Sequence, residues 1–390
     1  MRALAYYGKN DVRVVDKPEP AILHPEDAIV RVTTAAICGS DLHLYHGLVP
    51  DTRVGYTFGH ECVGIVEEVG PQVTAIAPGD RVVVPFTISC GRCFYCEQQM
   101  WSQCESSNPY SDLGGIYGYS HTTGGYEGMQ AEYVRVPFAN VGPKRLPDDV
   151  TDTQAIMLAD IFPTGYFGAE MAGIRPGDTV AVFGAGPVGL FAMRSARDFF
   201  HAGRVIAIDH VPYRLQFAAE QCGAEPVNFD DVPDVIALLK EMTDGRGPDA
   251  CIDAVGLEAD GSRLHSVQGA MFLEAGCITA LSWAIYAVRN GGTVSILGVY
   301  GPPFNHFFPI GWAMNRNLTL RMGQCNVLTY LDDLLARTRS REIDPAFVVT
   351  HELPLEDAPH GYEIFERKLD GAIKVLLKPQ ASTNGRNGAH

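Results

Sequence analysis

The sequence predicts an α/β fold with two differently built parts, and two features lead to this prediction. Residues 1 to about 160 consist of short β-rich runs, such as AIVRVTTAAI and CVGIVEEVG, broken by Gly and Pro. From about residue 165, apolar strands alternate with longer helical stretches, as in TVAVFGAG followed by PVGLFAMRSARDFF. This alternation is typical of βαβ units around a parallel sheet. We therefore expect a mainly β part followed by a doubly wound α/β part.

The chain is expected to return to its first part after about residue 300. There the alternation ends at a Pro-rich stretch, GPPFNHFFPI, and is followed by a predicted helix near YLDDLLARTRS and a predicted strand at AIKVLLKP. We place one domain at 1–164 and 300–390, and the other at 165–299. The final segment, PQASTNGRNGAH, has the composition of a disordered tail.

Composition and charge disfavour several classes of function. The 390 residues are 46% hydrophobic and 19% charged, which suits a chain with a sizeable core. No stretch approaches the ~18 apolar residues of a membrane span and the N-terminus lacks a signal-peptide core, so we expect a cytoplasmic protein without a membrane partner. A net charge of -16 without a Lys/Arg cluster disfavours nucleic acid as a partner.

A glycine-rich turn after the strand TVAVF predicts a dinucleotide site, because glycines let backbone amides at a helix N-terminus approach a pyrophosphate. The strand RVIAID then ends in Asp209, whose carboxylate suits the adenosine ribose hydroxyls and would repel a 2′-phosphate. NAD is therefore favoured over NADP, although Arg214 leaves NADP open. The alternative is a simple turn with Asp209 as a helix cap. The turn consists of Gly184, Ala185, Gly186, Pro187, Val188 and Gly189.

Four of the ten cysteines are crowded into one short segment: Cys90, Cys93, Cys96 and Cys104. Four thiolates close a tetrahedral shell with no open position, which is what a structural zinc ion requires. In a reducing compartment such spacing favours a metal over disulfides. An iron–sulfur cluster, free or oxidised cysteines, and a zinc ribbon that binds nucleic acid are the alternatives.

A catalytic zinc ion needs three protein ligands and an open position, and its ligands usually come from distant parts of a sequence. Cys38 lies in AAICGSDLH directly after a predicted strand, and His60 lies in the triplet GHE. Taken alone, each residue type is more often a buried thiol or a hydrogen-bonded histidine. Their spacing by itself does not identify them as ligands.

The run Gly59-His60-Glu61-x2-Gly64-x5-Gly70-x2-Val73 resembles the signature of zinc-containing medium-chain alcohol dehydrogenases. Cys38, the four-cysteine cluster and the GAGPVG turn follow in the order and spacing of that family, and the resemblance covers residues 1–379. It implies a GroES-like catalytic domain formed by both chain ends and interrupted by a Rossmann domain. It also implies a homotetramer or homodimer through the Rossmann edge.

Three runs, CGSDLHLYHG, LADIFPTGYFGA and DAVGLEADG, look most like the branch of glutathione-independent formaldehyde dehydrogenases and dismutases. In that branch an inserted loop near the cofactor helps to retain NAD. Residues 257–282 occupy the corresponding place in this sequence but diverge from it. Tight retention of the cofactor is therefore left open.

The resemblance implies a ligand set for the catalytic zinc ion. Cys38 and His60 match two family ligands, and Asp160 in MLADIFPTGYFGAE stands where the family often has a second cysteine. A carboxylate is a sound zinc ligand. Glu61 matches an acidic residue beside the metal, which orients the ligands or serves as an alternate ligand.

Four further residues receive roles from the resemblance, and Asp41 receives one from its charge. Ser40 and His43 match a proton relay that runs from a hydroxyl beside the zinc ion, through the cofactor ribose, to a histidine at the surface. Asp41 is expected to orient its neighbours. Phe86 matches a wall of the substrate pocket, and Lys374 a basic residue that reaches the cofactor phosphates. Without the resemblance these would be a turn residue, a surface histidine, a core aromatic and a solvated lysine.

The predicted function is zinc-dependent transfer of hydride between a small alcohol, or an aldehyde hydrate, and NAD, with one catalytic and one structural zinc ion in each chain. A zinc-free quinone or enone reductase of the same superfold is one alternative. The other is a cofactor-binding homologue without turnover, because a fold does not guarantee chemistry. The retained metal ligands disfavour both.

Overall fold

The computed structural model describes residues 1–256, 278–300 and 308–379. The chain forms two compact units, Met1–Pro163 with Asn326–His390 and Thr164–Cys325. Most of the inserted loop expected at 257–282 and nearly all of the expected C-terminal tail lie outside the described residues. The expected return to the first unit at residue 300 is wrong, because β13 (Thr319–Met322) still pairs with β12 (Thr293–Ile296) in the second unit.

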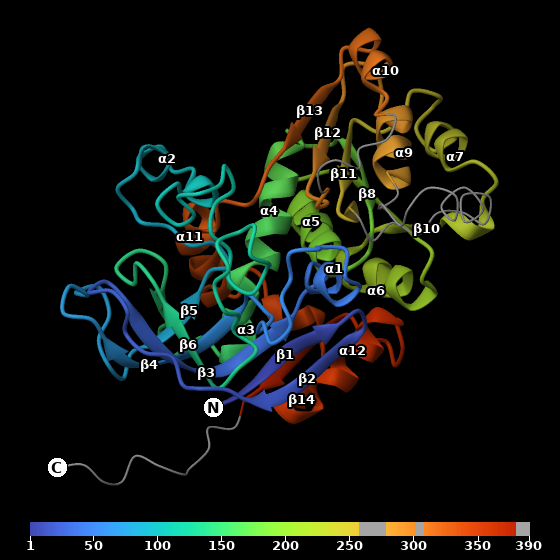
Figure 1. The fold of residues 1–390 in the computed structure, drawn as a ribbon. Helices are drawn as coiled ribbons and strands as arrows, with labels where there is room; N and C mark the ends of the chain where they lie inside the picture. The colour runs from blue at the N-terminus through green and yellow to red at the C-terminus, as the bar shows by residue number, and fades with distance from the viewer. Residues whose placement is uncertain (257–277, 301–307, 380–390) are drawn as a thin grey trace, which may run out of the picture. The chain divides into compact units, whose positions relative to one another are not determined.

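The first unit is built around a seven-stranded sheet with the order β14-β15-β3-β4-β5-β7, in which β6 also pairs with β3 (Figure 1). A separate antiparallel pair consists of β1 (Arg2–Gly8) and β2 (Asp11–Asp16). The mainly β character expected for this part is confirmed. The sheet strands are β3 (Ala28–Ile37), β4 (Cys62–Val69), β5 (Arg81–Val84), β6 (Tyr133–Val136), β7 (Lys144–Arg145), β14 (Val349–Pro354) and β15 (Lys374–Lys378).

The remaining elements of this unit lie at the ends of the strands or come from the returning C-terminal segment. Apolar side chains of β3, β4 and β15 share one core with Tyr362 and Phe365 of the helix α12. The predicted helix in the segment YLDDLLARTRS is confirmed as α11. The helices are α1 (Asp41–Tyr45), α2 (Phe94–Glu97), α3 (Asp152–Ala155), α11 (Val327–Arg339) and α12 (Ala358–Glu366), and the 3-10 turns are η1 (Trp101–Gln103), η2 (Ile156–Ala159), η5 (Pro345–Val348) and η6 (Leu355–Asp357).

Strand β3 determines where the ligand-bearing loops meet. It runs antiparallel to both β4 and β15, with the residue pairs Ala35–Cys62 and Ile37–Val375 near its C-terminal end. In antiparallel pairs the end of one strand lies beside the start of the next. The residues that follow β3 and those that precede β4 and β15 are therefore brought to one end of the sheet.

The second unit contains a six-stranded sheet with the order β10-β9-β8-β11-β12-β13, in which every neighbouring pair is parallel (Figure 1). This strand order is that of a doubly wound Rossmann sheet, as expected. The other strands are β8 (Thr179–Phe183), β9 (Arg204–Asp209), β10 (Glu225–Asn228) and β11 (Ala250–Asp253); the helices are α5 (Pro187–Asp198), α6 (Pro212–Cys222), α7 (Val235–Glu241), α9 (Thr279–Ala287) and α10 (Ile310–Asn315), and α4 (Ile161–Met171) enters this unit from the first.

Both faces of this sheet are covered, which explains why its central strands β8, β9 and β11 are buried without alternation. Ala181 and Phe183 of β8 share a core with residues of α7, α9 and α10. Successive side chains of a strand point to opposite faces, so Val180 and Val182 lie on the face that α5 and α6 contact.

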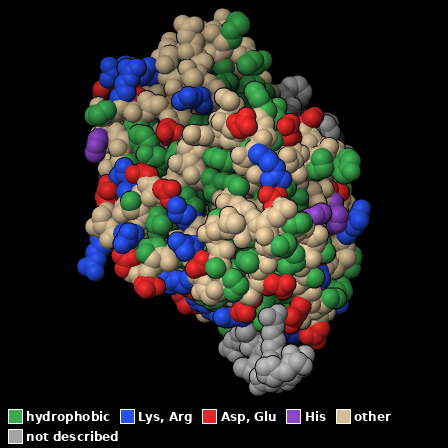
Figure 2. Space-filling view, turned by 90° about the vertical axis from the view of Figure 1, so that its left-hand side faces the viewer, with side chains coloured by type: hydrophobic (Ala, Val, Ile, Leu, Met, Phe, Trp, Pro, Cys, Tyr) green, Lys and Arg blue, Asp and Glu red, His purple; other side chains and the backbone are tan. Residues whose placement is uncertain are grey.

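Acidic and basic side chains are interspersed over the face of the molecule that Figure 2 shows. The excess negative charge of the chain is therefore not gathered into one patch on this face. Among the described parts of the chain, no helix combines the length and the apolar character that a membrane crossing needs.

Candidate functional site

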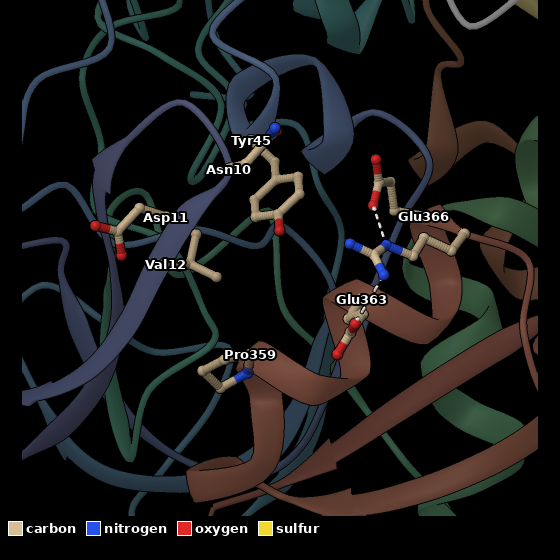
Figure 3. Close-up of a pocket in the computed structure, with 8 residues that line it drawn as sticks. Asn10, Asp11, Val12, Tyr45, Pro359, Glu363 and Glu366 are labelled. Atoms are coloured by element: carbon tan, nitrogen blue, oxygen red, sulfur yellow. Dashed lines mark ion pairs between the residues drawn. The ribbon is translucent and has the colours of Figure 1, made fainter.

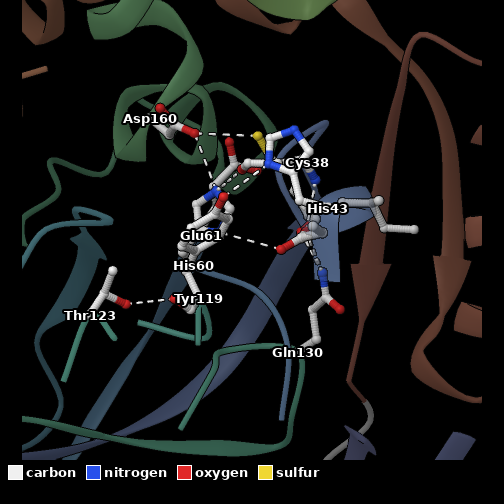
Figure 4. Close-up of polar contacts among 12 residues, drawn as sticks. Cys38, His43, His60, Glu61, Tyr119, Thr123, Gln130 and Asp160 are labelled. Atoms are coloured by element: carbon white, nitrogen blue, oxygen red, sulfur yellow. Dashed lines mark hydrogen bonds and ion pairs between the residues drawn. The ribbon is translucent and has the colours of Figure 1, made fainter. Parts of the chain in front are cut away.

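Cys38, His60 and Asp160 come together in the first unit although they are far apart in the sequence. Cys38 follows β3, His60 lies two residues before β4, and Asp160 ends the turn η2. The Cys38 thiol and His60 Nε2 each lie 3.4 Å from Asp160 Oδ2 (Figure 4). All three side chains are buried, and their ligand atoms lie within 4.8 Å of one another.

These donors fit a zinc ion, because a thiolate, an imidazole and a carboxylate are the ligand types of zinc and three of them leave one position open. Burial raises the pKa of Cys38, and the neighbouring Asp160 carboxylate raises it further. Burial opposes a charge on His60, but Asp41 and Asp160 together raise the pKa of this imidazole well above its ordinary value. A divalent cation held there would stabilise the Cys38 thiolate and offset the charge of the Asp160 carboxylate.

Asp41 contacts two of the three candidate ligands, and its role in orienting them stays a prediction. Its Oδ2 accepts a hydrogen bond from the Cys38 N–H at 3.0 Å, and its Oδ1 lies 3.3 Å from His60 Nδ1. A carboxylate at Nδ1 leaves Nε2 available as the ligand atom. Ser40 Oγ lies 3.3 Å from that same Nε2, beside the candidate metal position.

Glu61 and Lys374 form a fully buried ion pair next to the ligands. Lys374 Nζ donates to Glu61 Oε2 and, at 3.0 Å, to the carbonyl of Ile37. Burial raises the pKa of Glu61, and the ammonium opposes this shift. The role of Lys374 at the cofactor phosphates stays a prediction, since the structure pairs this side chain with Glu61. Among described residues, Glu61 Oε1 has no hydrogen-bond partner.

The expectation that His43 lies at the surface is wrong. Its side chain, on α1, is 3% exposed, and its Nδ1 lies 2.9 Å from the hydroxyl of Tyr119. Phe86 is also buried, with its ring centroid 6.1 Å from that of His60 in an edge-to-face arrangement. Phe86 therefore forms an apolar boundary beside a candidate ligand.

The four cysteines of the second set are buried, free and convergent. Backbone amides already point at the sulfur atoms: Cys90 N–H donates to Cys104 Sγ at 3.2 Å, and Arg92 N–H donates to Cys90 Sγ at 3.5 Å. Burial opposes ionisation of Cys90, but hydrogen bonds from Ser106 and from backbone amides lower its pKa to about 7. Such a set fits a closed tetrahedral zinc shell.

The expected cofactor turn lies between β8 and α5 in the second unit. Gly184 has a φ of +94°, and a Cβ atom at Gly189 would lie 1.9 Å from the Gly184 carbonyl oxygen, so the start of α5 approaches β8 closely only with these glycines. Asp209 accepts hydrogen bonds from the N–H groups of Ala185 at 2.7 Å and Val211 at 2.9 Å. Its role at the ribose stays a prediction.

A separate hollow of about 300 Å³ opens in the first unit between the β1–β2 turn, α1 and α12 (Figure 3). Two of its carboxylates, Glu363 and Glu366, already have a partner in Arg367 at 3.1 Å and 3.9 Å. The hollow is lined by neither the Cys–His–Asp set nor the four cysteines. It is therefore not the candidate catalytic site.

Comparison with known proteins decides the family. Residues 24–148 match the alcohol dehydrogenase GroES-like domain, and residues 187–267 match the zinc-binding dehydrogenase domain. The zinc-type alcohol dehydrogenase-like protein AdhB of Bacillus subtilis is 47% identical over 381 residues, which cover 97% of this chain and all of that protein. The chain belongs to the zinc-containing medium-chain alcohol dehydrogenases.

Other members of the zinc-containing medium-chain alcohol dehydrogenases agree with this assignment. The alcohol dehydrogenase TADH from Thermus sp. ATN1 matches with a TM-score of 0.83 and 41% identity, covering 97% of this chain and 100% of that one. A glutathione-independent formaldehyde dehydrogenase of Pseudomonas aeruginosa is 36% identical, with 94% of each chain covered. The expected family and fold class are confirmed, and this dehydrogenase is a zinc-dependent oxidoreductase.

Three polar residues of this dehydrogenase's site were not found from the sequence: Tyr119, Gln130 and Tyr362. Tyr119 and Tyr362 lie outside every motif that pointed to chemistry. Gln130 offered a weak signal, as a polar residue that begins the β-rich run QAEYVRVP. Polar residues beside strands are too common for that signal to be interpreted alone.

Proposed function

We propose that this dehydrogenase oxidises a small alcohol, or an aldehyde hydrate, by transferring hydride to NAD. The observation that carries the proposal is the convergence of Cys38, His60 and Asp160 in a buried set with one position left for substrate. Zinc, when bound there, supplies a Lewis acid that lowers the pKa of the alcohol hydroxyl, and NAD supplies the hydride acceptor.

The chain's own side chains would bind the substrate and move its proton. Ser40 Oγ, beside His60 Nε2, is placed to accept the hydroxyl proton as the alcohol ionises. His43 carries that proton further, with Tyr119 hydrogen-bonded to its Nδ1. Phe86 excludes water from one side of the ligands, which strengthens the electrostatic interactions there. Asp41 orients His60 through the contact of its Oδ1 with Nδ1.

A substrate panel tests this function. The panel contains formaldehyde, short primary alcohols, secondary alcohols and aromatic aldehydes, each assayed with NAD and with NADP through the absorbance of the reduced nicotinamide. We expect alcohol-dependent or aldehyde-dependent reduction of NAD. Reduction of an enone without any oxidation of alcohols or aldehydes would contradict the proposal, and so would cofactor binding without turnover.

We further propose that NAD is preferred to NADP because of Asp209, which ends β9 beside the glycine turn. Asp209→Asn keeps an acceptor for the Ala185 amide but removes the charge that would repel a 2′-phosphate. We expect the ratio of kcat/KM with NADP to kcat/KM with NAD to rise about tenfold, which corresponds to ~1.4 kcal/mol. Steady-state kinetics measure the ratio.

Asp234→Asn is the matched control, because Asp234 is an exposed acidic residue of the same unit that caps α7. It should leave the cofactor ratio unchanged. An unchanged ratio in Asp209→Asn would mean that another group sets the cofactor preference, with Arg214 the first to examine.

Two zinc ions per chain are proposed from the two convergent ligand sets, one ion in each set.

We also propose a homotetramer or homodimer that forms through β13, the edge strand of the second sheet. An edge strand offers unpaired backbone groups, and apolar side chains stand exposed around this one, Met322 at 61%, Met314 at 68% and Ile310 at 61%. The cytoplasmic location stays a prediction.

A further inference from the structure

Gln130 is fully buried near the candidate metal ligands, although it belongs to neither ligand set (Figure 4). Its side chain packs on Gly59, the residue before His60. Gly59 has a φ of +92°, and a Cβ atom there would lie 2.5 Å from Gln130 Cγ. The close contact shows that Gln130 occupies the space that any side chain at residue 59 would need.

Hydrogen bonds fix which way the Gln130 amide faces. Nε2 donates to the carbonyl of Ala36 at 2.9 Å and to Asp41 Oδ2 at 3.1 Å, while Oε1 accepts from the Tyr362 hydroxyl at 2.9 Å. A reversed amide would place its oxygen against two acceptors, the Ala36 carbonyl and the Asp41 carboxylate. Both N–H donors are therefore committed, one of them to Asp41.

Asp41 is the group through which Gln130 reaches the ligands. It is fully buried, and its Oδ2 receives the Gln130 amide together with the Cys38 backbone N–H at 3.0 Å. Its other oxygen, Oδ1, faces His60 Nδ1 at 3.3 Å. A buried carboxylate needs such donors to offset its lost hydration, so removing one of them frees Asp41 to turn.

We propose that Gln130 is a positioning residue of the catalytic metal site. By holding Asp41, it keeps the His60 ring in the tautomer and orientation that aim Nε2 at Cys38 and Asp160. Tyr362 of α12 holds Gln130 in turn, so the returning C-terminal segment takes part in setting the metal site. The inference rests on the proposed function, because it assumes that zinc binds at Cys38, His60 and Asp160.

The test is the zinc affinity of the intact chain, measured by transfer of zinc to a chromogenic chelator. We expect Gln130→Leu to weaken the binding of one of two zinc ions by about 10–100-fold, which is the usual effect of removing a group that orients a ligand. The ion in the four-cysteine set should keep its native affinity. Gln216→Leu, an exposed glutamine on α6, is the matched control and should change neither ion.

Tyr362→Phe is the milder variant and removes one hydroxyl while keeping the ring in the core. It should lower the affinity for the zinc ion at Cys38, His60 and Asp160 by less than about tenfold. The double variant Gln130→Leu/Tyr362→Phe should have the same affinity as Gln130→Leu alone, because both substitutions act through one chain of contacts. After cobalt substitution, the visible spectrum should change in Gln130→Leu and not in Gln216→Leu. A merely structural role would lower stability without changing that spectrum.

The possible failures are distinguishable. If the native chain binds two zinc ions and folded Gln130→Leu or Tyr362→Phe binds both with native affinity and an unchanged cobalt spectrum, the inference is overturned and the proposed function is unaffected. Additive losses in the double variant would overturn the connected chain from Tyr362. A native chain that binds one zinc ion only, in the four-cysteine set, would overturn both the metal site and the inference.

Discussion

Replacing Asp160 by alanine is expected to lower kcat/KM for alcohol oxidation by about 10³-fold or more. The substitution removes the carboxylate that lies 3.4 Å from both the Cys38 thiol and His60 Nε2, which leaves two of three ligands. Activation of the alcohol by a metal ion contributes several kcal/mol, and ~4 kcal/mol corresponds to about 10³ in rate. Formation of NADH in steady state measures the loss.

Two further variants sharpen the assignment of Asp160. Asp160→Cys restores the ligand that the family often has there, so it should bind zinc and keep part of the activity. Asp149→Ala removes an exposed carboxylate nearby in the sequence and should leave kcat/KM unchanged. Full activity in Asp160→Ala would remove Asp160 from the ligand set. Glu61, whose Oε1 has no hydrogen-bond partner within the described parts of the chain, would then be the third ligand to test.

Lys374→Met is expected to lower the free energy of unfolding by about 3–5 kcal/mol, the usual cost of breaking a buried ion pair by removing one partner. Both side chains of the pair are 0% exposed, and the ammonium also hydrogen-bonds the Ile37 carbonyl. Without it, the Glu61 carboxylate is left buried without a counter-charge. Denaturant unfolding monitored by circular dichroism measures the change.

Glu61→Gln/Lys374→Met should recover most of the stability that Lys374→Met loses, because no charge is then buried alone. Lys378→Met is the control on the same strand. Lys378 is partly exposed, and its contact to Glu352 at 3.8 Å should be worth less than ~1 kcal/mol. A loss below ~1 kcal/mol in Lys374→Met would show that the pair does not stabilise the fold.

The architecture was predictable because its two parts differ in local pattern. Strand–turn–helix order in the middle of the chain led directly to the six-stranded parallel sheet. The domain return was misplaced, since a Pro-rich stretch after residue 300 looked like a domain boundary. Instead α10 and β13 follow it in the second unit, and β13 completes the edge of the sheet. The pairing of β13 with β12 shows that this segment belongs to the second unit, and strand pairing cannot be read from local sequence.

The ligand sets were predictable to different degrees. The four cysteines lie close in the sequence, so their spacing alone indicates a metal shell. Cys38 and His60 are brought together by the pairing of β3 with β4, and Asp160 by the turn η2, so only the family resemblance connected the three before the structure did. Gln130 had no comparable signal, because its importance comes from contacts with Ala36, Asp41 and Tyr362, which belong to distant segments.

The burial of His43 and the ion pair of Lys374 could not be predicted from the sequence, for a common physical reason. Family motifs predict which position a residue occupies, but the surroundings decide its exposure and partners. Here Tyr119 binds the imidazole of His43, and the buried carboxylate of Glu61 binds the ammonium of Lys374. Neither Tyr119 nor the pairing of Glu61 with a residue more than 300 positions away follows from local sequence.

The most direct test of the account is anomalous diffraction at the zinc absorption edge from crystals of the intact chain. We predict two peaks per chain. One lies among the four cysteine sulfur atoms, and the other lies at about 2.0–2.3 Å from Cys38 Sγ, His60 Nε2 and a carboxylate oxygen of Asp160. A zinc-loaded crystal with no peak among Cys38, His60 and Asp160 would contradict the central claim.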